Sequence, residues 1–171
     1  AALALLAPSA RRAQTFEKVQ LFSTGSEAWG ALLLASDGNF YGCTPGTVFR
    51  ITPGGVLTTL VSLIPLNGVS PQAALVPGPD GNFYGTTTRG GTQNAGTLFR
   101  MTRWGRLDVL HEFSGSGGKY PLSLIQATDG NLYGVTYNGG AFGAGTIFRF
   151  SLTTGAFELL HSFKSLVDGY G

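Results

Sequence analysis

The segment Asp37-Gly-Asn-Phe-Tyr-Gly42 decides the fold, because the same pattern returns as DGNFYG at 80–85 and as DGNLYG at 129–134. A second pattern follows each copy and reads GTVFR, GTLFR and GTIFR, starting at Gly46, Gly96 and Gly145. Two independent patterns that recur in the same order indicate a tandem repeat, here with a period of about 49 residues.

Each repeat contains four short apolar segments separated by turn residues, which we call strands a, b, c and d. In the third repeat they read PLSLIQA, NLYGVTY, GTIFRFS and FELLHSF. Asp-Gly stands between a and b, and this pair favours a tight hairpin. The sequence therefore predicts an all-β, β-propeller-type tandem repeat of four-stranded antiparallel blades, with about three blades plus one strand in a partial ring.

Composition agrees with this fold class. The 171 residues include 27 Gly and 8 Pro, and only 12% are charged. Many tight turns and few solvent-facing surfaces are typical of sheets packed on both faces. A β-solenoid would need parallel strands, and the Asp-Gly hairpins argue against it.

The repeats also divide the chain. Residues 1–14 (AALALLAPSARRAQ) resemble the end of a secretory signal peptide. The repeat domain then covers 15–171. It comprises a lone d strand, three blades and the start of a further repeat, at 15–25, 28–63, 71–113, 120–163 and 164–171. Because rings use four or more blades, we expect either a fragment of a longer protein or a subunit that self-associates through open propeller edges.

These patterns resemble the GloVer (Gloeo/Verruco) tandem repeat of exported bacterial surface proteins, from Gln14 to Gly171. The resemblance rests on LHEF and LHSF in strand d, on DGN-x-YG, on GT-x-FR and on the paired glycines at 90–91 and 139–140. The first repeat departs from the pattern, because it lacks the paired glycines and has Cys43 where the second has Thr86. The resemblance implies export to the extracellular space or cell surface, and no characterised activity.

Several partner classes are disfavoured by charge and hydropathy. The formal net charge is +2 and the basic residues are scattered, so we do not expect a nucleic-acid partner. No apolar stretch is long enough to predict a transmembrane segment. The single cysteine, Cys43, is interpreted as a small buried apolar residue.

The repeated polar residues are interpreted as structural. We expect hairpin turns from the aspartates and packing between blades from the tyrosines, histidines and arginines, the last with their charged heads reaching solvent. The residues concerned are Asp37, Asp80 and Asp129; Tyr41, Tyr84 and Tyr133; His111 and His161; and Arg50, Arg100 and Arg149. Apart from the Asp and Asn of the turns and the Tyr and Arg of the strands, no polar group is expected to recur in every blade, and we predict no catalytic residue, metal site or cofactor.

The connection between strands b and c is the best candidate for binding, because its length varies on a constant framework. It is rich in Gly, Thr and Asn, and this favours a ligand that carries hydroxyls or a protein surface. The candidate ligand-binding residues are Arg89, Asn94, Tyr137, Asn138 and Phe142.

Three functions remain open at this level. The first is an exported, non-catalytic scaffold that binds a glycan or a surface protein, or mediates adhesion. The second is a fragment of a propeller-based extracellular enzyme, a polysaccharide lyase or hydrolase, whose active site lies in further blades. The third is a spacer without a ligand.

Overall fold

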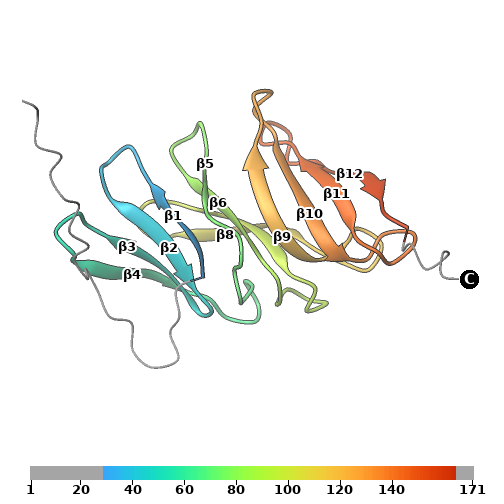
Figure 1. Ribbon diagram of the computed structural model, residues 1–171, viewed down its shortest axis with the longest axis horizontal. Helices are drawn as coiled ribbons and strands as arrows, with labels where there is room; N and C mark the ends of the chain where they lie inside the picture. Colours follow the sequence, from blue (N-terminus) through green and yellow to red (C-terminus); the bar gives the residue numbers. More distant parts are fainter. Residues whose placement is uncertain (1–28, 165–171) are drawn as a thin grey trace, which may run out of the picture.

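The computed structural model describes residues 29–164, which form three antiparallel sheets of four strands each (Figure 1). Blade 1 contains β1 (Trp29–Leu34), β2 (Phe40–Thr44), β3 (Thr47–Ile51) and β4 (Leu57–Ser62). Blade 2 contains β5 (Val76–Pro77), β6 (Phe83–Thr87), β7 (Thr97–Met101) and β8 (Leu107–Glu112). Blade 3 contains β9 (Lys119–Gln126), β10 (Leu132–Asn138), β11 (Thr146–Phe150) and β12 (Phe157–Ser162).

Within every sheet the strands lie in chain order, as in an up-and-down meander. The predicted all-β, propeller-type blades are confirmed. The predicted signal peptide remnant at 1–14, the lone strand at 15–25 and all of 164–171 except Lys164 lie outside the described residues.

The Asp-Gly pairs form the hairpin turns between the first two strands of each blade. The glycines Gly38, Gly81 and Gly130 have φ values of 79°, 75° and 80°. This left-handed conformation is cheap only for glycine, and it lets the chain reverse within a few residues. The repeated turn therefore sets the same register at the start of each blade.

The first strand of blade 2 is much shorter than its counterparts. β5 has two residues, whereas β9 has eight. β5 ends at Pro77, which pairs with Phe83 just as Gln126, the end of β9, pairs with Leu132, so β5 is short because it starts only at Val76. The repeat pattern predicts a strand here, and its length depends on residues that do not repeat.

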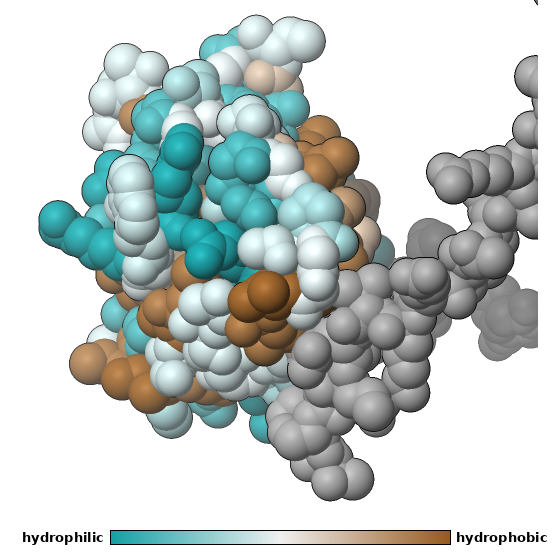
Figure 2. Space-filling view, turned by 90° about the vertical axis from the view of Figure 1, so that its left-hand side faces the viewer, coloured by the Kyte–Doolittle hydropathy of each residue, from teal (hydrophilic) through white to brown (hydrophobic). Residues whose placement is uncertain are grey.

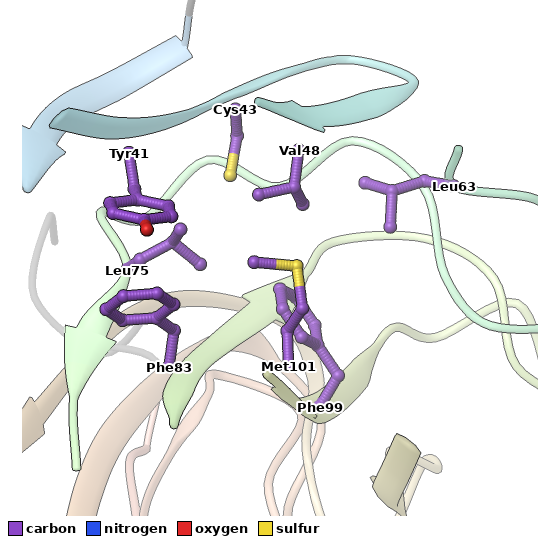
Figure 3. Packing of buried hydrophobic residues seen from close by; sticks show 8 residues of the cluster. All are labelled: Tyr41, Cys43, Val48, Leu63, Leu75, Phe83, Phe99 and Met101. Carbon is purple, nitrogen blue, oxygen red and sulfur yellow. The ribbon is translucent and has the colours of Figure 1, made fainter. Parts of the chain in front are cut away.

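The hydrophobic core lies between the blades. Each of the two junctions buries one hydrophobic cluster, and both blades at a junction contribute four residues to it. The cluster between blades 1 and 2 contains Tyr41, Cys43, Val48 and Leu63 opposite Leu75, Phe83, Phe99 and Met101 (Figure 3). The cluster between blades 2 and 3 contains Tyr84, Ala95, Leu98 and Phe113 opposite Leu124, Leu132, Phe148 and Phe150. Apolar residues on both faces of a strand thus reflect burial against two neighbouring blades.

Candidate functional site

A hollow of about 400 Å³ opens between blades 2 and 3. It is lined by one residue of the β4–β5 connection, two of the β6–β7 connection and three of strands β9 and β10. These residues are Gln72, Thr88, Arg89, Tyr120, Leu122 and Tyr137. The hollow therefore joins side chains that lie far apart in the sequence.

The hollow is built from positions that are equivalent in the repeat but differ in chemistry. Thr88 and Tyr137 both lie three residues after the Tyr-Gly pair. Gln72 and Leu122 both follow the proline of the first strand segment. The framework is thus repeated while the side chains that line the hollow are not, which is an arrangement that allows specific binding.

Backbone hydrogen bonds hold the β6–β7 side of the hollow. The Thr88 amide donates to the Ser70 carbonyl at 3.1 Å, and Arg89 and Val69 exchange bonds of 3.2 and 2.8 Å. The Arg89 side chain is exposed and makes no hydrogen bond or ion pair with another residue of 29–164. Its guanidinium donors are consequently available to an acceptor.

Two residues near the hollow have a positive φ although they are not glycine. Ser70 has φ 60° and Tyr120 has φ 59°. In this conformation the Tyr120 amide donates to the Ala95 carbonyl at 2.8 Å, and the Ser70 amide donates to the Pro45 carbonyl at 2.9 Å. Each bond joins one blade to the preceding one. Such strain costs of order 1 kcal/mol per residue and is often found at functional sites.

Buried threonine pairs close the base of the connections between the second and third strands. The Oγ1 atoms of Thr87 and Thr97 are 2.9 Å apart, as are those of Thr136 and Thr146. Thr97 Oγ1 also donates, at 3.0 Å, to the carbonyl of Asn67 in the β4–β5 connection. In blade 1 the corresponding pair is Thr44 and Thr47, 2.8 Å apart.

The expectation that only Asp, Asn, Tyr and Arg recur in every blade is therefore wrong. The threonine of GT-x-FR recurs and is paired with a threonine of the second strand in each blade. The sequence carries this signal, because Thr47, Thr97 and Thr146 stand at one repeat position. The pairs keep the ends of the variable connection at a fixed spacing.

The repeated aspartates are engaged within their own turns. Asp80 accepts hydrogen bonds from the Asn82 amide at 3.1 Å and from the Tyr84 hydroxyl at 2.8 Å. Burial by itself raises the pKa of Asp80, but hydrogen bonds from Asn82 and Tyr84 outweigh it and lower the pKa. The same bonds form at Asp37 and at Asp129. The interpretation of these carboxylates as turn residues is confirmed.

The histidines and arginines also make structural contacts. His111 stacks on Phe157 of the next blade, with ring centroids 3.7 Å apart, and burial lowers the pKa of His111. Arg100 forms an ion pair with Asp108 of the neighbouring strand at 3.0 Å, and Arg149 pairs with Glu158 in the same way. The arginines of blades 2 and 3 are therefore held by an acid of their own blade, which the sequence reasoning did not foresee.

The five predicted binding residues do not all meet. Arg89 and Tyr137 line the hollow. Asn94 accepts a hydrogen bond from the Gly90 amide at 2.9 Å and so closes its own turn. Asn138 ends β10 opposite Lys119, and Phe142 is half exposed beneath the Lys164 ammonium. The sequence reasoning considered only the connection between the second and third strands, and it missed Gln72 in the β4–β5 connection and Tyr120 in strand β9.

No helix within residues 29–164 is long and apolar enough to cross a membrane. In the same residues no group of three or more His, Cys, Asp or Glu side chains lies together as a metal site would require.

Solved β-propeller structures share this fold. The nidogen/laminin complex matches with a TM-score of 0.60 and 16% identity over 80% of this chain and 49% of that chain. A gluconolactonase from Xanthomonas campestris matches with a TM-score of 0.60 and 10% identity over 81% and 48%. An aldose sugar dehydrogenase from Streptomyces coelicolor, in its PQQ-bound form, matches with a TM-score of 0.53 and 19% identity over 77% and 47%.

This chain thus spans about half the length of those structures, and the likeness shows the fold alone. No curated protein matches the sequence. The model of the Gloeobacter/Verrucomicrobia repeat matches residues 5–171, almost the whole chain. This chain therefore belongs to the Gloeobacter/Verrucomicrobia repeat family.

Proposed function

We propose that this chain is part of an exported, non-catalytic repeat protein that binds a glycan at the cell surface through the hollow between blades 2 and 3. The observation that carries the proposal is the lining of that hollow. It combines the unpaired Arg89 guanidinium with the Gln72 amide and the rings of Tyr120 and Tyr137.

This set of groups suits a sugar better than an apolar ligand. Guanidinium and amide groups form hydrogen bonds with hydroxyls, and a tyrosine ring offers a flat face together with a hydroxyl. Tyr137 is 64% exposed, so its ring face is open to a partner. A volume of about 400 Å³ lies within the usual range for small-ligand sites.

The non-catalytic part of the proposal rests on the repeated carboxylates. A general acid or base needs a carboxyl group that is free to exchange a proton. Asp37, Asp80 and Asp129 instead accept hydrogen bonds inside their turns, and these bonds keep the pKa of each low.

Binding is tested with a glycan array probed by the full chain, followed by titration calorimetry with the best glycan. Arg89→Ala and Tyr137→Ala should each weaken binding about tenfold or more, which corresponds to at least about 1.4 kcal/mol. Phe142→Ala is the matched control, because Phe142 is also an exposed aromatic residue but does not line the hollow. Unchanged affinity in both hollow variants, with a bound glycan, would show that the site lies elsewhere.

Location is tested separately. An epitope-tagged copy expressed from its own locus should be labelled by antibody on intact cells. Labelling only after lysis would contradict export while leaving the binding result unaffected.

A further inference from the structure

The outer face of blade 3, which points away from blade 2, repeats the surface by which blades 1 and 2 pack against their successors. At the two existing junctions this surface presents a tyrosine, a central aliphatic residue and the last apolar residue of the repeat. They are Tyr41, Val48 and Leu63 in blade 1, and Tyr84, Leu98 and Phe113 in blade 2. All six are buried.

Blade 3 presents the equivalent residues without a described neighbour. Ile147 lies opposite Val135 on one side and His161 on the other, so these three residues share the outer face. Ile147 is only partly buried, whereas its counterparts Val48 and Leu98 are fully buried. Phe163 is 41% exposed, whereas its counterpart Phe113 is 1% exposed.

The complementary surface lies on the opposite side of blade 1. Leu75 and Leu124 each cover the second-strand glycine of their blade and are 4% and 6% exposed at the junctions. Leu32 covers Gly42 in the same way but is 55% exposed, and Leu34 in the same strand is 62% exposed. Figure 2 shows this side of the molecule, where hydrophobic residues form several separate patches among polar ones.

Charge does not oppose a contact between these two surfaces. The Arg149 guanidinium on the outer face of blade 3 is already paired with Glu158. At the existing junction between blades 2 and 3, Arg100 and Asp108 occupy the same positions and are paired likewise. A new junction built like the one between blades 2 and 3 would therefore cover the Arg149–Glu158 ion pair without leaving either charge unpaired.

We infer that blade 1 of a second copy of this chain docks on the outer face of blade 3, and that two copies close a single ring. The two existing junctions are the template for the new ones. This chain covers about half of the β-propeller structures to which it is similar, so two copies together have about the length of one such ring. Head-to-tail contacts of this kind give a closed assembly when the rotation between units completes a circle.

The inference is tested by sedimentation equilibrium of the full chain over a range of concentrations. We expect a reversible equilibrium between one chain of 17.8 kDa and a species of twice that mass. A single-chain mass at every concentration would overturn the inference. A series of ever larger assemblies would overturn the closed ring of two copies.

Two charge variants separate head-to-tail docking from other modes of association. Ile147→Glu and Leu32→Arg should each weaken dimerisation by at least about tenfold in Kd, because each places a charge in an apolar junction. Leu66→Glu is the control, since Leu66 is 70% exposed in the β4–β5 connection and belongs to neither face. Circular dichroism verifies that each variant is folded.

Mixing the two charge variants gives the decisive result. An Ile147→Glu chain keeps an intact blade 1 face, and a Leu32→Arg chain keeps an intact blade 3 face. A mixed pair therefore has one native junction and a second in which Glu meets Arg, and we expect the dimer to return. If mixing restores nothing, or if Ile147→Glu dimerises as well as the unmodified chain, the docking surface is assigned wrongly.

Discussion

Replacing Phe113 with alanine should destabilise the protein far more than replacing Phe163, although both end the same segment of the repeat. Phe113 is 1% exposed and lies in the junction between blades 2 and 3. Its ring centroid is 5.1 Å from those of His111 and Phe148 and 5.8 Å from that of Phe157. Truncation at such a site leaves a cavity, and the usual cost is about 3–5 kcal/mol.

Phe163 has no such surroundings within the described part of the chain. It is 41% exposed, and among residues 29–164 its ring contacts that of His161, with centroids 4.9 Å apart. Its removal from a single chain should cost about 1 kcal/mol. The two residues are identical in type and repeat position, so the difference measures burial between blades rather than a property of the strand.

Urea unfolding followed by far-ultraviolet circular dichroism measures both costs, at a concentration where the chain is a monomer. Equal costs for the two variants would refute the view that the junctions between blades carry the core. If two copies dock as inferred above, the cost at Phe163 should rise with concentration, because docking would bury that ring.

Three further results are expected. Lowering the pH from about 7 to 5 should reduce the free energy of unfolding, because burial lowers the pKa of His111 in the folded state and the unfolded chain, in which this pKa is near 6.5, therefore takes up the proton first. In urea titrations at several pH values, His111→Phe should make the free energy of unfolding depend less on pH. An unchanged dependence would contradict this explanation. Thr97→Val should destabilise the protein by about 1–3 kcal/mol, because it removes buried hydrogen bonds. Thr86→Val should be neutral or stabilising, because the buried Thr86 hydroxyl has no hydrogen-bond partner within residues 29–164. Equal losses of stability for the two variants in the same urea assay would contradict this reasoning. Cys43 should not react with a thiol reagent until the protein unfolds, because burial raises the pKa of its thiol to about 12; rapid labelling of the folded chain would oppose the placement of Cys43 in the core.

The sequence predicts the blade well because its repeated residues act through local geometry. Asp37 and Asn39, for example, form their turn within three residues, so the pattern alone identifies it. The length of β5 could not be predicted in this way, because β5 ends at the same repeat position as β9 but starts later, at Val76, and no repeated residue marks that start. The positive φ of Ser70 and Tyr120 was equally hidden, since it is imposed by hydrogen bonds to the carbonyls of Pro45 and Ala95 in another blade.

The candidate site shows the opposite relation between repetition and role. Residues that recur, such as the threonine of GT-x-FR, form hydrogen bonds within their own blade or to the connection that precedes it, and leave few free donors or acceptors for a ligand. Arg89 and Tyr137 stand at neighbouring repeat positions, where the equivalent residues are Asn138 and Thr88. The composition of the connection points to Arg89, Tyr137 and Asn138 as candidates, whereas nothing in it singles out Thr88. Gln72 escaped notice because a single glutamine in a connection has no pattern. In a repeat protein of this kind, the residues that differ between equivalent positions at the mouth of a junction are therefore the ones to test first for binding.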